Sequence, residues 1–176
     1  PADMDDITDT LLHTKQPDVL VILMESLGGT FVEELGGTPG VTPNLSRLIP
    51  EGIFWGNYYS NSFRTDRGTA SLISGNVSYP EVSLMTAKEM HGKLPSLAKT
   101  FNRNGYSSSY LYAGPMTNMG KRTYLENCEF QHLLDYTAFT PEELTSTWGA
   151  DDEISSMKVY SLLAQKDSTD KPLFFV

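Results

Sequence analysis

An apolar run near the amino terminus, VLVILM at residues 19–24, constrains the fold of this chain more than any other feature. Six consecutive apolar residues fall far short of the roughly 18 to 20 that span a membrane, and short runs of this kind are typical of parallel strands covered on both faces. Glu25, Ser26 and a glycine pair at residues 28–29 follow the run, which indicates that a strand passes into a loop here. We therefore predict a central strand with a carboxylate at its carboxyl end.

Strand-like and helix-like segments alternate along the rest of the chain. Aromatic or apolar composition predicts strands at residues 53–59, 106–112 and 172–176, and apolar periodicity predicts helices at residues 95–104, 118–127 and 149–165. Shorter helices are predicted to begin near Thr42 and near Thr65. This alternation predicts an α/β fold with a largely parallel central sheet flanked by helices. In such sheets, polar residues just past the carboxyl ends of strands are the natural site of chemistry.

The length of 176 residues suits one domain with a sizeable core. Residues 1–16 are polar and acidic, so we predict a linker or frayed terminus there and one folded unit over residues 17–176. The sequence stops inside the strand-like run at residues 172–176, and domains rarely end inside a core strand. We therefore expect a truncated piece of a longer protein, with any membrane anchor outside this chain.

The formal net charge of −9 disfavours some classes of function. An acidic surface opposes the nonspecific attraction to phosphate on which nucleic-acid binding depends, so we expect no nucleic-acid partner. It also opposes broad adhesion to anionic lipid, although a local basic site could still hold one phosphate group. Cys128 is the single cysteine, which excludes an intramolecular disulfide and a thiolate metal cluster.

Glu25 is the first candidate for chemistry, because its carboxylate emerges where the backbone leaves the core. An ionised carboxylate there is costly unless a cation or hydrogen-bond donors meet it. A hard divalent metal would do so with oxygen ligands. The turn at residues 28–29 could equally satisfy Glu25 with backbone N–H groups, and the local pattern leaves both interpretations open.

The segment SFRTDRGTAS at residues 62–71 is the second candidate. It places the hydroxyl of Thr65 between Arg64 and Arg67, where a helix is predicted to begin. A helix N-terminus presents free N–H groups to an anion, and arginine can hold a phosphoryl oxygen with two hydrogen bonds. A metal-bound threonine hydroxyl would be an activated nucleophile. The alternative is a capping threonine between two solvated arginines.

Short motifs that follow one another in order give the chain a family resemblance over roughly residues 17–176. The sequence resembles the lipoteichoic acid synthases and related phosphoglycerol transferases, which belong to the sulfatase and alkaline phosphatase superfamily. The resemblance would make this chain the amino-terminal part of their catalytic domain. The motifs are DVLVILMES at 18–26, TPNL at 42–45, EGIF at 51–54, NYY at 57–59, RT at 64–65, LPSLAK at 94–99, NGYS at 104–107, WG at 148–149 with DD at 151–152, and KPLFF at 171–175.

The resemblance implies roles for particular residues. Glu25 and Thr65 would bind one divalent cation, Mn²⁺ or Mg²⁺, and Thr65 would also be the catalytic nucleophile. Arg64 and Arg67, which flank Thr65 in the local pattern, are the residues that we expect to contact the substrate. The family completes its metal site with an Asp-His pair that would lie beyond residue 176. The chain by itself would therefore bind metal poorly and be inactive.

The resemblance also implies a substrate and a compartment. The enzyme would transfer glycerol phosphate from a lipid phosphodiester through a threonine-linked intermediate to an acceptor hydroxyl or to water, on the extracytoplasmic side of a membrane. The synthases carry a substrate patch after the strand matched by residues 106–112, and its cation is matched here by Lys121 or Arg122. Tyr112 and Met119 stand where that patch has histidine and tryptophan, so the preference for glycerol phosphate is left open.

Two alternatives remain from the sequence. A sulfatase that hydrolyses sulfuric esters would need a formylglycine made from Cys or Ser in a Cys/Ser-x-Pro/Ala-x-Arg motif. Cys128 lies in ENCEF at residues 126–130 and does not match that motif, while Thr65 occupies the position of the nucleophile. The second alternative is a non-catalytic, membrane-tethered domain that has kept the fold.

Overall fold

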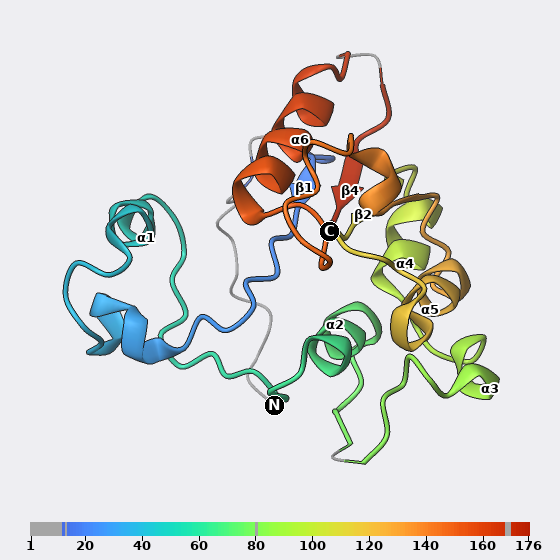
Figure 1. Ribbon diagram of the computed structural model, residues 1–176, viewed down its shortest axis with the longest axis horizontal. Coiled ribbons are helices and arrows are strands. Elements are labelled where there is room, and N and C mark those ends of the chain that lie inside the picture. The colour runs from blue at the N-terminus through green and yellow to red at the C-terminus, as the bar shows by residue number, and fades with distance from the viewer. Residues whose placement is uncertain (1–11, 13, 80, 168–169) are drawn as a thin grey trace.

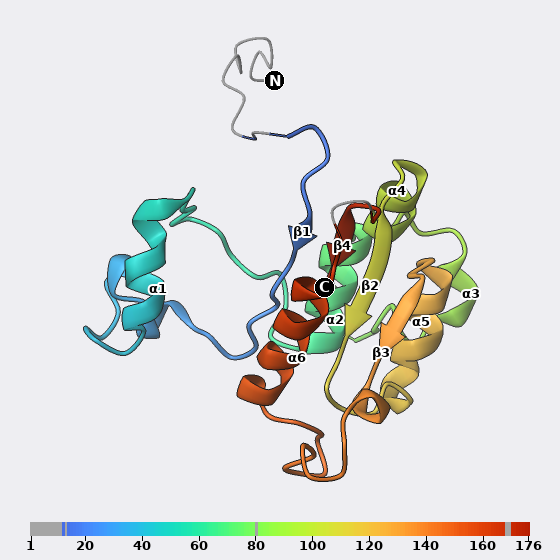
Figure 2. The same cartoon turned by 90° about the horizontal axis from the view of Figure 1, so that it is seen from above.

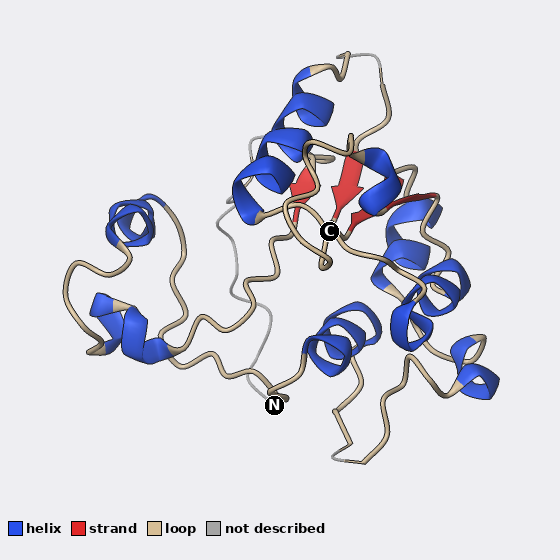
Figure 3. Ribbon diagram, viewed as in Figure 1, coloured by secondary structure: helices blue, strands red, loops and turns tan. Residues whose placement is uncertain are grey.

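A parallel β-sheet runs through the computed structural model, with helices on both of its faces (Figures 1 and 3). The structure describes residue 12 and residues 14–79, 81–167 and 170–176, and the predicted linker over residues 1–16 lies mostly outside them. Within the described residues the sheet has four strands in the order β1-β4-β2-β3, and every neighbouring pair is parallel. The strands are β1 (Val19–Leu20), β2 (Ser107–Leu111), β3 (His132–Leu134) and β4 (Leu173–Phe175). The predicted α/β fold with a parallel sheet is therefore confirmed.

The helices divide between the two faces of the sheet (Figures 1 and 2). Helices α2, α4 and α5 cover one face, and α6 covers the other. The α-helices are α1 (Pro43–Leu48), α2 (Thr65–Ser74), α3 (Lys88–His91), α4 (Leu97–Arg103), α5 (Lys121–Asn127) and α6 (Asp152–Ala164). Short 3-10 helices are η2 (Gly29–Phe31), η3 (Glu33–Leu35), η4 (Ile49–Glu51), η5 (Asn118–Gly120) and η6 (Tyr136–Ala138). No described helix combines the length and the apolar character that a membrane span requires.

The main core lies between the sheet and α2, α4 and α5. Phe174 of β4 stacks on Phe101 of α4, with ring centroids 4.2 Å apart and planes 8° from parallel. On the neighbouring strand, Tyr110 meets Phe130 edge to face at 5.6 Å. Tyr124 of α5 is fully buried in the same cluster. Aromatic pairs of this kind contribute about 0.5–1.5 kcal/mol each beyond the area that they bury.

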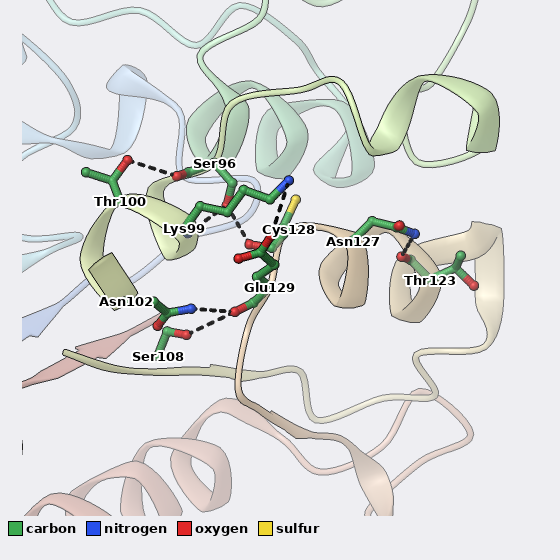
Figure 4. A network of polar contacts seen from close by, with 9 residues as sticks. All are labelled: Ser96, Lys99, Thr100, Asn102, Ser108, Thr123, Asn127, Cys128 and Glu129. Carbon is green, nitrogen blue, oxygen red and sulfur yellow. Dashed lines mark hydrogen bonds and ion pairs between the residues drawn. The ribbon is translucent and has the colours of Figure 1, made fainter. Parts of the chain in front are cut away.

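A polar network ties α4 to the segment that follows α5 (Figure 4). Ser96 accepts a hydrogen bond from the N–H of Lys99 as the N-cap of α4 and donates one to the carbonyl of Cys128 at 2.8 Å. Glu129 has a φ of 64°, a conformation that costs a non-glycine residue about 1–2 kcal/mol. Its carbonyl accepts hydrogen bonds from Asn102 and Ser108, which offset that cost and direct the chain into β3.

The prediction of a central strand over residues 19–24 is wrong in extent and in position. Only Val19 and Leu20 form β1, and β1 lies at an edge of the described sheet. Beyond Val21 the run leaves the sheet, and Ile22 is 73% exposed. The apolar composition indicated a strand but could not indicate its neighbours. The interior positions belong to β4, which pairs with β1 and β2, and to β2, which pairs with β4 and β3.

The strand predicted at residues 53–59 is also absent, and that segment is irregular and exposed. Its aromatic residues favour extended backbone, but a strand needs a neighbour, and none of the described strands pairs with it. The segment belongs to an excursion of the chain between β1 and α2 that also carries α1, and α1 stands apart from the sheet (Figure 2). Conversely, the sequence analysis missed β3, because three residues are too few to show a period.

Replacing Ser96 by alanine should destabilise the fold by about 1–3 kcal/mol, because it removes a helix cap and leaves the buried carbonyl of Cys128 without its donor. Urea denaturation of the purified protein measures this change. The control is Ser161→Ala, which removes an exposed hydroxyl that bonds to the carbonyl of Met157 within α6. We expect that control to change stability by no more than about 0.5 kcal/mol. Equal effects of the two substitutions would contradict the role given to Ser96.

Candidate active site

A pocket of about 530 Å³ opens where the segments after β1 and β2 meet the start of α2. Tyr112 directly follows β2, and Glu25 follows the short strand β1. Because the two strands lie in one parallel sheet, their carboxyl ends meet at the same edge. Four of the six residues singled out from the sequence line this pocket together, namely Glu25, Arg64, Thr65 and Lys121. The other lining residues are Phe63, Asp66, Tyr112, Pro115, Asn118, Met119 and Trp148.

Thr65 is the first residue of α2, which places its hydroxyl at the amino end of a ten-residue helix. Arg64 precedes it in extended conformation, and its side chain does not cap the helix. The first intrahelical bond runs from the N–H of Gly68 to the carbonyl of Arg64, so the preceding N–H groups have no partner within the helix. These groups and the helix dipole favour an anion beside Thr65.

Asp66 is a pocket residue that the sequence analysis missed. Its side chain is 8% exposed, and Oδ1 lies 3.3 Å from Nε of Arg64. Oδ2 is buried and has no hydrogen-bond partner within the described part of the chain. A buried carboxylate oxygen without a donor is costly unless a cation meets it. The sequence does show an acidic residue directly after Thr65. Acidic residues are common in the first turn of any helix, so this position did not by itself indicate a functional role.

Lys121 lies on the pocket wall, only 7% exposed, with Nζ 3.1 Å from the centre of the Tyr112 ring. Burial lowers the pKa of Lys121 to about 8, and the negative charges of Glu25 and Asp66 offset part of that shift. Burial also raises the pKa of Tyr112, and the charge of Glu25 raises it further. The charge of Glu25 therefore acts on both Tyr112 and Lys121.

Close packing before α5 helps to place Lys121. Gly120, at the N-cap of α5, has a φ of 72°, and a Cβ atom there would lie 2.6 Å from the carbonyl oxygen of Met85. A larger residue would therefore have to push the start of the helix away from residues 83–85. The glycine lets α5 begin close enough to the pocket for Lys121 to cover the Tyr112 ring.

Two predicted substrate-binding residues do not line the pocket. The guanidinium carbon of Arg67 lies 5.9 Å from the centre of the Phe63 ring. Arg122 donates a 2.7 Å hydrogen bond to Asp135 and lies 3.9 Å from Glu126. Arg122 therefore serves the fold in this structure. A contact of either arginine with substrate stays a prediction.

The oxygen atoms in the pocket suit a hard divalent cation. Glu25, Thr65 and Asp66 supply carboxylate and hydroxyl groups, the ligands that Mg²⁺ and Mn²⁺ prefer. The orphaned Oδ2 of Asp66 is the observation that favours a cation here. Within the described ranges, no group of three or more His, Cys, Asp or Glu side chains is arranged to hold a metal ion. The residues therefore fit part of a metal site.

Comparison with known proteins defines the family to which this chain belongs. The family model described as Sulfatase matches residues 17–176, and the chain therefore belongs to the sulfatase family. Members of this superfamily act on phosphate or sulfate esters and are generally metal-dependent enzymes.

Two solved structures share the fold. A protein in the alkaline phosphatase superfamily from Vibrio parahaemolyticus superposes with a TM-score of 0.84 at 26% identity, over 92% of this chain. The lipoteichoic acid synthase LtaP from Listeria monocytogenes superposes with a TM-score of 0.78 at 13% identity, over 90% of this chain. The matches cover 40% and 39% of those two proteins, so this chain spans about two fifths of their length.

The Arg122–Asp135 pair yields a prediction about pH. Burial by itself would raise the pKa of Asp135, but hydrogen bonds from Thr137 and Arg122 outweigh burial and hold this pKa below its usual value. A carboxyl group with a lowered pKa stabilises the fold above its unfolded pKa of about 4, and this stabilisation disappears as the pH falls through the folded value. Asp135→Asn should therefore destabilise the protein by about 1–2 kcal/mol at neutral pH and by less in acid.

A double-mutant cycle with Arg122→Gln isolates the pair. We expect a coupling energy of about 1 kcal/mol or less, because solvent screens the half-exposed guanidinium. Urea denaturation at neutral and acid pH measures both the loss of stability in Asp135→Asn and the coupling energy of the pair. If Arg122→Gln left stability unchanged and instead raised KM for an ester substrate, the substrate-binding role would replace the structural one.

Proposed function

We propose that this chain is part of a metal-dependent phosphoryl-ester transferase or hydrolase in which Thr65 is the nucleophile. The observation that supports this proposal best is the pocket at the start of α2. One aliphatic hydroxyl, two carboxylates and one buried ammonium group line it, from Thr65, Glu25, Asp66 and Lys121. These residues come from three separate segments of the chain, since Thr65 and Asp66 are neighbours. A structural role for any one of them does not explain why all four meet.

The chain's own groups suit a two-step displacement. In the first step Oγ of Thr65 bonds to phosphorus and loses its proton, while the bond from phosphorus to the leaving oxygen breaks and the leaving alcohol takes up a proton. In the second step the oxygen of an acceptor hydroxyl or of water bonds to phosphorus and loses its proton, while the bond from phosphorus to Oγ1 of Thr65 breaks and Oγ1 takes up a proton. The N–H groups at the start of α2 and the cations of Arg64 and Lys121 stabilise negative charge on the phosphoryl oxygens.

Glu25, Thr65 and Asp66 are the residues of this chain that would hold a divalent cation, Mn²⁺ or Mg²⁺. When bound, such a cation supplies Lewis-acid stabilisation and lowers the pKa of a coordinated hydroxyl. Further ligands beyond residue 176 are part of the proposal, because cations of this kind usually take about four to six ligands. Asp66 adds to this set a carboxylate whose second oxygen has no protein donor in the described chain.

The finer proposal concerns substrate and location. We infer a lipid phosphodiester as the donor of a glycerol phosphate group, handled on the extracytoplasmic side of a membrane by an enzyme whose anchor lies outside this chain. The order of the sequence motifs supports this inference. The structural likeness to the lipoteichoic acid synthase LtaP supports the fold that it requires.

Hydrolysis of sulfate esters is the second candidate. A formylglycine made from cysteine would need a cysteine in the pocket, but Cys128 is 2% exposed and packs in the main core. Burial also raises the pKa of its thiol. Thr65 occupies the pocket instead, and this favours phosphate esters over sulfate esters.

Thr65→Ala in the full-length enzyme should lower kcat by at least about a thousandfold, because Thr65 supplies the one aliphatic hydroxyl among the lining residues of the described pocket. Release of 4-nitrophenol from bis(4-nitrophenyl) phosphate measures this loss, and 4-nitrophenyl sulfate run in parallel separates the two ester classes. The control is Ser71→Ala, which removes a hydroxyl from the same helix that does not line the pocket. Full activity of the Thr65 variant would exclude the nucleophile, and an inactive wild type would favour the non-catalytic alternative.

Metal binding is tested separately from activity. Mn²⁺ at a hundredfold excess over its Kd should stabilise the full-length protein by about 2.7 kcal/mol. Glu25→Gln and Asp66→Asn should each weaken this stabilisation, since each replaces a carboxylate in the pocket by a neutral amide. Glu34→Gln, on the exposed 3-10 helix η3, should leave it unchanged. If the melting temperature of the Glu25 variant rises with Mn²⁺ as much as that of the wild type, Glu25 is not a ligand.

A further inference from the structure

The pocket is lined by charged side chains, of which Asp66 and Lys121 are buried and form its floor, and by exposed apolar side chains that form its rim. Glu25, Asp66 and Lys121 supply the charges, and three large apolar side chains stand around the opening. Among these, Phe63 is 91% exposed and Trp148 is 76% exposed, and Met119 is also open to solvent. Exposed side chains of this size gathered at one pocket form an apolar surface that a ligand can bury.

Trp148 is exposed, yet its backbone is held firmly. Its N–H donates to Oγ of Ser146, and Ser146 and Gly149 exchange two backbone hydrogen bonds that close a tight turn. Gly149 has a φ of 114°, and a Cβ atom there would lie 2.0 Å from the carbonyl oxygen of Ala113. A Cβ atom on Gly114 would lie 2.4 Å from the carbonyl oxygen of Trp148.

These close approaches show that the turn packs directly, backbone against backbone, on the loop that follows β2. Residues larger than glycine at positions 114 and 149 would separate the two loops. Because Tyr112 and Pro115 of that loop also line the pocket, the contact holds the indole at a fixed place on the rim. An aromatic side chain on a rigid backbone loses little conformational entropy when a ligand covers it.

We propose that Trp148, held by the Gly114–Gly149 contact, is a specificity-determining residue that binds the alkyl portion of the ester substrate, together with Phe63 and Met119. This rests on the proposed function, since it assumes that the ester group itself lies on the charged floor. The rim favours an alkyl chain over a sugar, because a sugar needs hydrogen-bonding groups beside a stacking ring. Asn118 is the one uncharged amide side chain among the lining residues of the described pocket.

Two pairs of probes test the role of Trp148 in the full-length enzyme, a pair of ester substrates for turnover and a pair of phosphonates for binding. The first pair is 4-nitrophenyl octyl phosphate and 4-nitrophenyl methyl phosphate, which differ only in the alkyl group. Trp148→Ala should raise KM for the octyl ester about tenfold or more with little change in kcat, because loss of one buried apolar contact weakens binding by that order. KM for the methyl ester should stay within about twofold. Trp148→Phe should restore most of the affinity, since it keeps an aromatic surface.

Matched variants separate this role from general damage. Trp55→Ala removes the other tryptophan, which is also exposed but does not line the pocket, and it should change neither KM. Gly149→Ala should reproduce the loss on the octyl ester without removing the indole. A Trp148→Ala variant that binds both esters like the wild type, or that weakens both equally, would overturn the proposal.

Calorimetric binding of octylphosphonate and methylphosphonate keeps this test independent of turnover. Octylphosphonate should bind the wild type more tightly than methylphosphonate, and Trp148→Ala should abolish the difference. If the phosphonates behave as expected while Thr65→Ala retains activity, the assignment of Thr65 as nucleophile is wrong and the proposed apolar subsite is supported. If Thr65→Ala is inactive but the two phosphonates bind equally, the proposed function stands and the apolar subsite is wrong.

Discussion

The insertion of β4 between β1 and β2 is the constraint on which the rest of the structure depends. Phe174 pairs in register with Val19 on one side and with Ser108 on the other, so one short strand near residue 176 joins the first strand of the chain to its middle. The same phenylalanine stacks on Phe101 and is 1% exposed, which ties the strand order to the main core. At the amino ends of these strands, Asp18 accepts a hydrogen bond from the N–H of Leu173. Without β4 the described sheet offers β1 no partner.

This pairing also creates the pocket. β1 and β2 run parallel on either side of β4, so the segments that leave their carboxyl ends bring Glu25 and Tyr112 to the same edge of the sheet. Packing of α2 and α5 on one face then adds Thr65 and Lys121. The charges and the burial of the pocket are therefore products of packing. Burial lowers the pKa of Lys121, and the charges of Glu25 and Asp66 offset part of that shift.

Local patterns in the sequence were enough for much of the fold. The helix that begins at Thr65 and the strand at residues 107–111 were predicted because periodicity and end signals are local properties. The alternation of elements was enough for the α/β class. The predicted central strand at residues 19–24 and the predicted strand at residues 53–59 failed for one reason. Apolar or aromatic composition records a preference for extended backbone, whereas a strand exists only where another strand completes its hydrogen bonds.

The features of the candidate site also separate into those that depend on neighbouring residues in the sequence and those that depend on packing. By itself the sequence determined that Glu25 follows an apolar run and that Thr65 opens a helix, because both facts depend on near neighbours in the chain. Only the tertiary structure decided that Asp66 and Lys121 share a pocket with them, and that Arg122 turns away to Asp135. It also decided where Trp148 stands, through a contact of two glycines in separate loops. Burial, strand order and backbone contact between distant segments depend on how the whole chain packs, and no local pattern of residues contains that information.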